Sequence, residues 1–238
     1  MKITVKIRRF NPETDSSGKM QTYLVDAGPT DRILDLLLTI KRTQDGSLCF
    51  RKSCAHGVCG SDAMRINGRE RLACKTLVQD VVTDDSKEIT LRPLRHLPVQ
   101  RDLMVDQKDF FDKYRIVAPF LIPKDPAPKK GEYQQSRTER KAFDDPTKCI
   151  LCGACFSACP VPDTNTLFIG PAASIQAARF IKDSRDKGLG PRLDVLDKPN
   201  GVWACENHFE CTRVCPREIK ITKLINETKR EITKFKEG

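Results

Sequence analysis

The chain has 238 residues, a length that suits one large domain or two ordinary ones, and we expect two. Its net charge of +10 comes from 42 basic residues interleaved with 32 acidic ones, and no basic stretch alternates with aromatic residues, so nucleic-acid binding is not expected. The longest strongly apolar stretch, at 33–40, is far shorter than the roughly 20 residues that cross a bilayer, which argues against a membrane-spanning segment.

The first hundred residues predict strands around one helix. Apolar alternation and flanking turn residues predict strands at 3–7, 20–27, 63–67, 71–76 and 88–93. The first two are expected to form a hairpin, and Asn67 and Gly68 to form the turn between the third and the fourth. A helix is expected between the second and third strands, with Thr30 or Asp31 as its N-cap and its end near Arg42.

The second half of the chain changes to helical spacing. We therefore expect one domain at 1–105 and a second at 106–238. Within the second domain, the Pro/Lys-rich stretch 122–132 favours a surface loop, and a helix with proline in its first turn is expected over 171–186. The last predicted helix has one apolar face formed by Ile221, Leu224, Ile225, Thr228, Ile232 and Phe235.

Eleven cysteines are the most informative part of the composition. The sequence shows no N-terminal apolar segment of signal-peptide type, and disulfide frameworks occur mainly in small exported domains. We therefore expect most of these thiols to be reduced and to bind metal.

The stretch KCILCGACFSACP has the spacing C-x2-C-x2-C-x3-C-P, formed by Cys149, Cys152, Cys155, Cys159 and Pro160. In bacterial ferredoxins this run supplies three thiolates to one 4Fe-4S cluster, and its fourth cysteine reaches a second cluster. Soft thiolate donors suit iron, and two-residue spacings let one loop wrap several irons. The run therefore predicts a pair of clusters and requires a second run of cysteines.

The stretch ACENHFECTRVCP supplies the second run with one thiol fewer, because His208 stands three residues after Cys205. If the crossed arrangement holds, the 4Fe-4S ligands are Cys149, Cys152, Cys155 and Cys215. The thiols that remain are Cys159, Cys205 and Cys211, and three thiolates fit a 3Fe-4S cluster. Cysteine pairs also bind zinc, but tetrahedral zinc does not explain two runs that each end in proline, and disulfides are less favoured still.

The stretch CAHGVCGSD, at 54–62, resembles the C-x4-C-x2-C loop of plant-type 2Fe-2S proteins, with Asp62 in place of the third cysteine. Cys54, Cys59, Asp62 and Cys74 then form the predicted 2Fe-2S site, since a carboxylate oxygen can bind iron. The alternative is that Asp62 is an ordinary exposed residue and Cys49 is the fourth donor. Cys49 lies on the wrong side of the loop by spacing, so we favour Asp62.

These motifs, with RPLRHLPVQRDLMVD, FIGPAA, DSRD and NGVWACENHFECTRVCP, cover nearly the whole chain and resemble the iron-sulfur subunits of succinate dehydrogenase and fumarate reductase. The resemblance implies an α+β fold: an N-terminal β-grasp domain of the plant-type 2Fe-2S ferredoxin kind, followed by an α-helical domain of the bacterial ferredoxin kind. Family members with aspartate at the third plant-type position use it as a ligand, which supports Asp62.

The resemblance also implies partners and a location. It implies an FAD-containing flavoprotein that carries the dicarboxylate chemistry, one or more membrane-anchor subunits that can contain haem, and a quinone. The chain itself would relay electrons through 2Fe-2S, 4Fe-4S and 3Fe-4S clusters as a peripheral protein on the cytoplasmic face of a bacterial inner membrane. No catalytic triad, phosphate loop or dinucleotide fingerprint is present, which agrees with substrate chemistry on another chain.

Two departures from the family pattern lie near the third cluster. Ubiquinone-using members commonly carry tryptophan shortly after the Cys-Pro pair and histidine after the first cysteine of the last run. Here Asp163, Thr164 and Glu206 hold those places, whereas Pro160 is retained on the quinone side. We therefore favour menaquinone. The other departure, His208, can bind iron, but a histidine there more often faces solvent or the anchor.

Three functions are compatible with these motifs. The favoured one is a subunit of succinate:quinone oxidoreductase, with the reverse reaction, quinol:fumarate reduction, as the alternative because both directions use the same relay. A soluble electron-transfer module of another flavoenzyme differs by lacking a membrane-bound partner. A zinc-stabilised interaction protein differs in its metal content.

Overall fold

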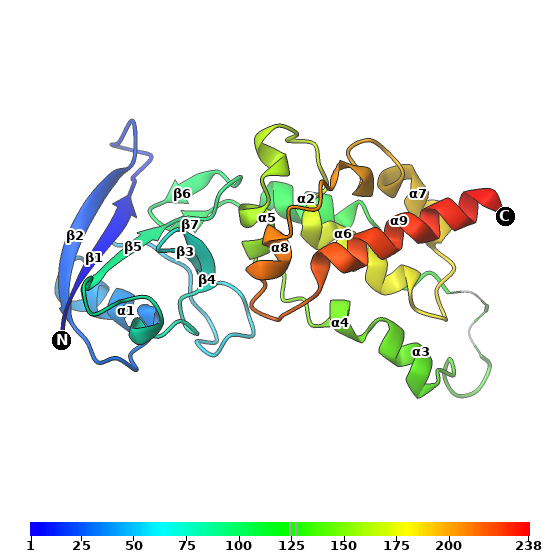
Figure 1. The fold of residues 1–238 in the computed structure, drawn as a ribbon, viewed down its shortest axis with the longest axis horizontal. Helices are drawn as coiled ribbons and strands as arrows, with labels where there is room; N and C mark the ends of the chain where they lie inside the picture. Colours follow the sequence, from blue (N-terminus) through cyan, green and yellow to red (C-terminus); the bar gives the residue numbers. More distant parts are fainter. Residues whose placement is uncertain (124, 127) are drawn as a thin grey trace. The chain divides into compact units, whose positions relative to one another are not determined.

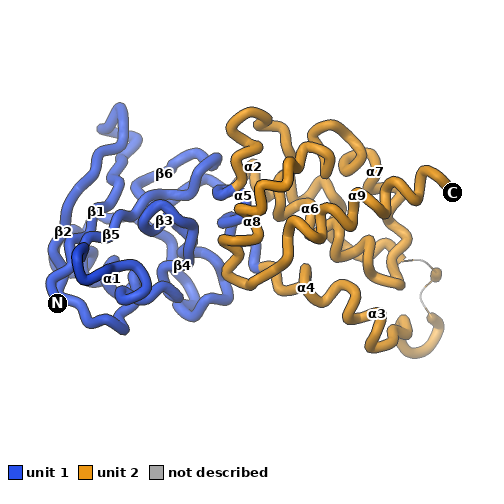
Figure 2. The backbone as a smooth tube through the Cα atoms, viewed as in Figure 1, with its two compact units in different colours: residues 1–107, 150–158 blue, residues 108–149, 159–238 orange. Residues whose placement is uncertain are grey.

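The computed structural model of the chain describes residues 1–123, 125–126 and 128–238 and divides them into two compact units (Figures 1 and 2). Unit 1 contains residues 1–107 and 150–158, and unit 2 contains residues 108–149 and 159–238. Unit 1 thus includes a short segment from the first cysteine run of the second half. The predicted domain limits at 1–105 and 106–238 stay a prediction.

Unit 1 is built on a five-stranded mixed sheet with the order β2-β1-β5-β3-β4. Its strands are β1 (Lys2–Arg9), β2 (Lys19–Asp26), β3 (Ala63–Ile66), β4 (Arg69–Leu72) and β5 (Glu88–Arg92). β1 pairs with β2 as the predicted antiparallel hairpin and with β5 in parallel, and β3 pairs antiparallel with both β4 and β5. The predicted β1–β2 hairpin is confirmed. The predicted turn between β3 and β4 is confirmed too, and its residues Asn67 and Gly68 both have positive φ.

The core of unit 1 lies between this sheet and helix α1 (Ile33–Thr43). Alternate β1 residues Ile3, Val5 and Ile7 are fully buried, as the two-residue period of a strand requires. The predicted caps of α1 were wrong, because Arg32 is the N-cap and its N–H donates to Asp35 in the first turn at 3.0 Å. Asp31 instead accepts the N–H of Gly28 at 2.8 Å.

Smaller elements complete unit 1: 3-10 helix η1 (Val78–Asp80), strands β6 (Val99–Arg101) and β7 (Met104–Val105), and helix α5 (Ala154–Ala158). α5 packs against β4, where Ser157 Oγ donates to the buried carboxylate of Glu70 at 2.7 Å. The predicted strand 71–76 was too long at its end. β4 ends at Leu72. The chain then turns, and the N–H of Cys74 donates a hydrogen bond to the carboxylate of Asp62.

Unit 2 is helical. Its α-helices are α2 (Lys108–Arg115), α3 (Arg137–Ala142), α4 (Asp144–Thr147), α6 (Gly170–Ile181), α7 (Leu189–Leu196), α8 (Glu210–Arg213) and α9 (Ile221–Glu237). The 3-10 helices are η2 (Val161–Asp163) and η3 (Val202–Ala204). α6 is buried on nearly all sides and packs against α9 (Figure 1). The sheet of unit 1 and the helices of unit 2 confirm the α+β class.

Two predicted helices of unit 2 need comment. α6 ends at Ile181 instead of near residue 186. Just after this end, the Asp183 carboxylate accepts hydrogen bonds from the backbone N–H and from the Nε–H of Arg185. Such local bonds between a side chain and the backbone compete with helical hydrogen bonds. The apolar face of α9 is confirmed from Ile221 to Ile232, whereas Phe235 is half exposed. No helix in the described ranges is both long enough and apolar enough to cross a membrane.

The predicted surface loop at 122–132 contains Lys124 and Ala127, which lie outside the described residues. Its described residues are largely exposed. At its start, the N–H of Ile122 donates to Asp186 at 2.9 Å, which ties this segment to the turn after α6.

Candidate iron-sulfur sites

The loop at 54–62 brings two of its predicted ligands together. The Sγ atoms of Cys54 and Cys59 lie 3.2 Å apart. The N–H groups of His56 and Cys59 donate to Cys54 Sγ at 3.5 and 3.3 Å. Donors aimed at this sulfur lower the pKa of the Cys54 thiol to about 6, the largest cause being the N–H of His56. The loop therefore favours Cys54 as a thiolate, the form that binds metal.

The buried side of the same site holds Asp62 and Cys74. Asp62 is 3% exposed, and its Oδ2 accepts the N–H of Cys74 at 2.6 Å. Its Oδ1 is buried and has no hydrogen-bond partner among the described residues. A buried carboxylate oxygen without a partner is costly, and a metal ion would satisfy it. Burial, followed by the neighbouring Asp62, raises the pKa of the Cys74 thiol to about 12.

Within unit 1, the 54–62 loop packs against the first cysteine run of the second half. Gly60 has φ of +70°, and a Cβ built on it would lie 2.7 Å from Cys152 Cβ and 3.0 Å from Cys152 Cα. Only glycine fits such a close approach of two backbones. Cys152 and Cys155 are both buried in this unit. The structure thus places the predicted 2Fe-2S loop beside one predicted 4Fe-4S ligand, Cys152.

The other two predicted 4Fe-4S ligands, Cys149 and Cys215, belong to unit 2 and are partly buried. The segment that leads to Cys149 is tied to the one that follows Cys215, because the N–H of Lys220 donates to Asp145 Oδ2 at 2.9 Å. This contact joins residues 75 positions apart in the sequence.

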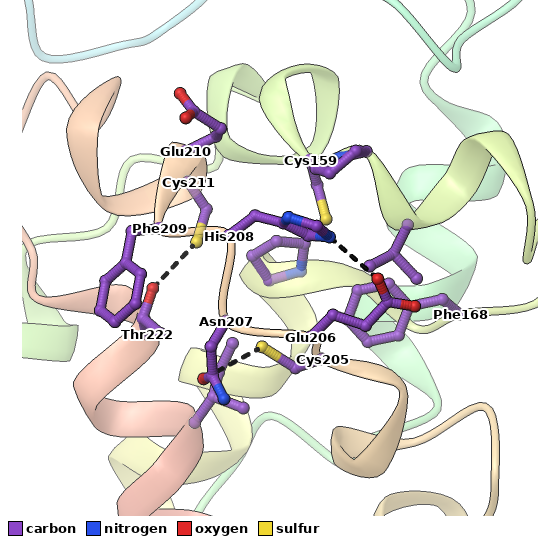
Figure 3. A pocket seen from close by; sticks show the side chains of 14 residues that line it. Cys159, Phe168, Cys205, Glu206, Asn207, His208, Phe209, Glu210, Cys211 and Thr222 are labelled. Atoms are coloured by element: carbon purple, nitrogen blue, oxygen red, sulfur yellow. Dashed lines mark hydrogen bonds and ion pairs between the residues drawn. The ribbon is translucent and has the colours of Figure 1, made fainter.

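The predicted ligands of the third cluster, Cys159, Cys205 and Cys211, line one cavity of unit 2 (Figure 3). Pro160 and His208 also line it. Burial raises the pKa of the Cys159 thiol to about 12 and also raises the pKa of Cys211. Buried thiols of this kind lose their protons on binding metal, because the metal charge replaces the missing solvation.

His208 lies at the rim of this cavity. Its side chain is 45% exposed, and its Nε2 lies 2.9 Å from Glu206 Oε2 (Figure 3). The imidazole thus already has a hydrogen-bond partner in a carboxylate that is itself exposed. The side chain is thus part of the cavity lining and is also partly exposed to solvent.

Sequence reasoning missed the contribution of helix α9 to this cavity. Thr222 Oγ1 lies 3.5 Å from Cys211 Sγ, Asn226 donates to Asn207 at 2.9 Å, and Lys229 donates to the carbonyl of Cys205 at 3.0 Å. The spacing i, i+4, i+7 puts Thr222, Asn226 and Lys229 on one helix face. The same spacing is present in the sequence, on the same helix as the apolar stripe.

The backbone of each cysteine loop contains left-handed residues. Ala55 has φ of +58°, Leu151 of +52°, and Asn207 and Phe209 of +60° and +64°. Such a conformation costs a non-glycine residue about 1–3 kcal/mol and turns successive N–H groups toward one side of the chain. Loops of this shape can surround an anionic group, and an iron-sulfur cluster with its thiolates is such a group.

No three His, Cys, Asp or Glu side chains in the described ranges are grouped closely enough to hold one metal ion. Converging thiols, amides aimed at sulfur and the unpaired Asp62 oxygen together fit iron-sulfur clusters.

Comparisons with known proteins agree with this geometry. Residues 4–112 match the family described as a 2Fe-2S iron-sulfur cluster binding domain, and residues 145–219 match the family described as a 4Fe-4S dicluster domain. The two matched ranges hold the 54–62 loop and both cysteine runs of the second half.

Relatives match over nearly the whole chain. A fumarate reductase iron-sulfur subunit of Mycobacterium tuberculosis is 41% identical over 92% of this chain and 87% of its own length. A succinate dehydrogenase iron-sulfur subunit of Coxiella burnetii is 39% identical over 97% of each chain. Among solved structures, a chain of the Mycobacterium smegmatis Sdh1 complex in the apo form superposes with a TM-score of 0.88 at 28% identity, covering 100% of this chain and 98% of that one.

Proposed function

Because the chain belongs to the family of iron-sulfur subunits of succinate dehydrogenase and fumarate reductase, we propose that it carries electrons from an FAD-containing flavoprotein to quinone at a membrane anchor. The proposed direction is succinate oxidation. The dicarboxylate chemistry belongs to the flavoprotein. When bound, the clusters supply one-electron carriers between the flavin and the quinone.

The proposed ligands follow the three cysteine groups. Cys54, Cys59, Asp62 and Cys74 hold 2Fe-2S; Cys149, Cys152, Cys155 and Cys215 hold 4Fe-4S; Cys159, Cys205 and Cys211 hold 3Fe-4S. Support comes from the family matches for the first two kinds of cluster and from the contacts described above for the individual residues.

The observation that carries the third assignment is the cavity of unit 2. Cys159, Cys205 and Cys211 line it together, whereas the position where a fourth thiol would stand is His208, paired with Glu206. Three thiolates with no fourth match the ligand number of a 3Fe-4S cluster.

Spectroscopy of the purified complex tests this assignment. We expect the oxidised complex to give the paramagnetic signal of a 3Fe centre without oxidative damage, and His208→Ala to keep that signal unchanged. Mössbauer spectra that show two cubanes in the wild type, with His208→Ala converting one to a 3Fe centre, would make His208 a ligand and refute the assignment.

The remaining parts of the proposal concern the setting of the chain. It docks as a peripheral subunit on the cytoplasmic face of a bacterial inner membrane, beside one or more anchor subunits that can contain haem. Fumarate reduction is the alternative direction, supported by the name of the 41% identical relative. Assay of the membrane complex in both directions decides between them, since the driving force depends on flavin, quinone and conditions.

A further inference from the structure

A short chain of hydroxyl groups leads from helix α9 to one of the cysteines in the cavity of unit 2. Thr222 Oγ1 lies 3.5 Å from Cys211 Sγ, and Thr212 Oγ1 lies 3.1 Å from Thr222 Oγ1. The N–H of Thr222 donates back to Thr212 Oγ1 at 3.0 Å. Figure 3 shows the contact between Cys211 and Thr222 at the cavity wall.

Both ends of the direct contact are removed from water. Thr222 is 1% exposed and Cys211 is 7% exposed. In such surroundings a hydrogen bond is electrostatically stronger than in water, and the hydroxyl has no solvent as an alternative partner. The Thr222 hydroxyl therefore stays directed toward its neighbours in the protein.

The protonation state of Cys211 sets the direction of the hydrogen bonds. A cysteine bound to iron is a thiolate and has no proton to donate, so Thr222 must be the donor in its contact with sulfur. Since the proton of Thr222 is then used, Thr212 is the donor in the contact between the two hydroxyls. The Thr212 hydroxyl and N–H also lie within hydrogen-bond reach of Cys211 Sγ, so Thr212 supports the same sulfur directly as well. The N–H of Thr222 lies in the first turn of α9, where a helix leaves N–H groups without a helical partner. It donates to Thr212 Oγ1, which therefore acts as an acceptor in this contact. All three bonds point consistently toward the sulfur.

We infer that Thr222 is a positioning residue that orients the Cys211 ligand and raises the reduction potential of the third cluster, with Thr212 holding the Thr222 hydroxyl in its donating direction. This rests on the proposed function, because it requires Cys211 to bind a cluster. A hydrogen bond to a ligating sulfur stabilises the reduced, more negative state more than the oxidised one. Loss of the hydroxyl should therefore lower the potential.

The test is a redox titration of the purified complex, followed by electron paramagnetic resonance, with iron content measured on the same samples. Thr222→Val keeps the side-chain shape and removes the hydroxyl, Thr222→Ser retains it, and Thr212→Val removes the second link. Thr228→Val is the matched control, because Thr228 is equally buried on α9 and its hydroxyl bonds to the helix carbonyl of Leu224 at 2.9 Å.

We expect Thr222→Val to lower the midpoint potential of the third centre at unchanged iron content. The shift should correspond to up to about a tenfold change in the ratio of reduced to oxidised centre, which is about 59 mV for a one-electron couple. Thr222→Ser should restore the potential, Thr212→Val should cause a smaller shift in the same direction, and Thr228→Val should cause none. The 2Fe-2S potential should not move in any variant.

Three results would overturn the inference. These are a potential in Thr222→Val equal to that of Thr228→Val, an equal shift of all three centres, and a Thr222→Ser variant that behaves like valine. If Thr222→Val loses its third centre, the serine and Thr212→Val variants decide by the same criteria. A wild-type complex without the resonance signal of a third centre, and with correspondingly less iron, refutes the proposed function itself, and this is seen before any variant is compared.

Discussion

Asp62 shows how one buried side chain can take part in two interactions. Its Oδ2 accepts the N–H of Cys74, which fixes the carboxylate in the loop, while its buried Oδ1 has no partner among the described residues. We propose Oδ1 as the atom that would bind iron while Oδ2 keeps its contact with Cys74. The aspartate is thus both an anchor for the backbone of Cys74 and the proposed fourth ligand.

Substitution of Asp62 tests this dual role. Asp62→Cys should keep the 2Fe-2S cluster with a shifted potential, because a thiolate is a softer donor at the same position. Asp62→Ala should weaken or lose the cluster, and resonance spectra with potentiometry of the purified complex measure both effects. Asp35→Ala is a control, because that carboxylate bonds only near the start of α1. An alanine variant of Asp62 with unchanged signal and potential would contradict the assignment.

At the scale of elements, the close packing of two cysteine loops in unit 1 depends on a missing side chain. The 54–62 loop lies against the segment of Cys152 at Gly60, and helix α5 that follows is held to β4 by the bond between Ser157 and Glu70. These contacts join segments about ninety residues apart in the chain. They bring two of the proposed cluster loops together within unit 1.

Gly60→Ala should destabilise unit 1 and disturb both neighbouring loops. The new Cβ would lie 3.0 Å or less from Cys152 backbone and side-chain atoms, and overpacking of this kind costs about 1–3 kcal/mol, in addition to about 1 kcal/mol for alanine at positive φ. Denaturant unfolding of the purified protein measures the sum. Gly68→Ala is the matched control, because Gly68 has φ of +80° with no atom within 4 Å of the new Cβ.

Both variants place alanine at positive φ, so the difference between their losses of unfolding free energy measures the clash of the new Cβ with Cys152 alone. Gly60→Ala should lose clearly more unfolding free energy than Gly68→Ala, and its 2Fe-2S and 4Fe-4S signals should broaden or weaken. Equal losses in the two variants would show that the contact with Cys152 contributes nothing beyond backbone strain.

At the scale of the whole molecule, the chain presents the third cysteine group in unit 2 and the first in unit 1. Around the third group, Asp163 and Thr164 follow Pro160, and Glu206 follows Cys205 and pairs with His208. The tryptophan and histidine common in ubiquinone-using members are absent from these places. A quinone headgroup bound beside the third group, as proposed, would therefore meet different hydrogen-bond donors and acceptors on this chain.

We expect the physiological quinone to be menaquinone. A headgroup bound by different donors need not be the same quinone, because a buried polar group without its partner lowers affinity strongly. The purified complex should contain menaquinone and turn over matched naphthoquinone analogues in preference to benzoquinones in both directions. Bound ubiquinone, with efficient turnover on benzoquinone alone, would refute this. Glu206→His tests the contribution of this chain, and an unchanged preference would assign selectivity to the anchor subunits.

Much of this protein was determined by local sequence. The cysteine spacings, the β1–β2 hairpin, the Asn67 and Gly68 turn and the apolar stripe of α9 depend on residues within a few positions of one another, so periodicity and turn chemistry predict them. The α+β class and the family follow from the same patterns. Spacing also indicated the three ligand groups, because a loop that wraps a cluster needs its donors at short, regular intervals.

Only the tertiary structure decided the rest. The contact of Gly60 with Cys152 joins distant segments, and the direction in which Thr222 meets Cys211 depends on how α9 packs beside the cavity. Contacts of this kind are set by the packing of whole elements, because burial acts on surfaces that assemble only when the chain has folded.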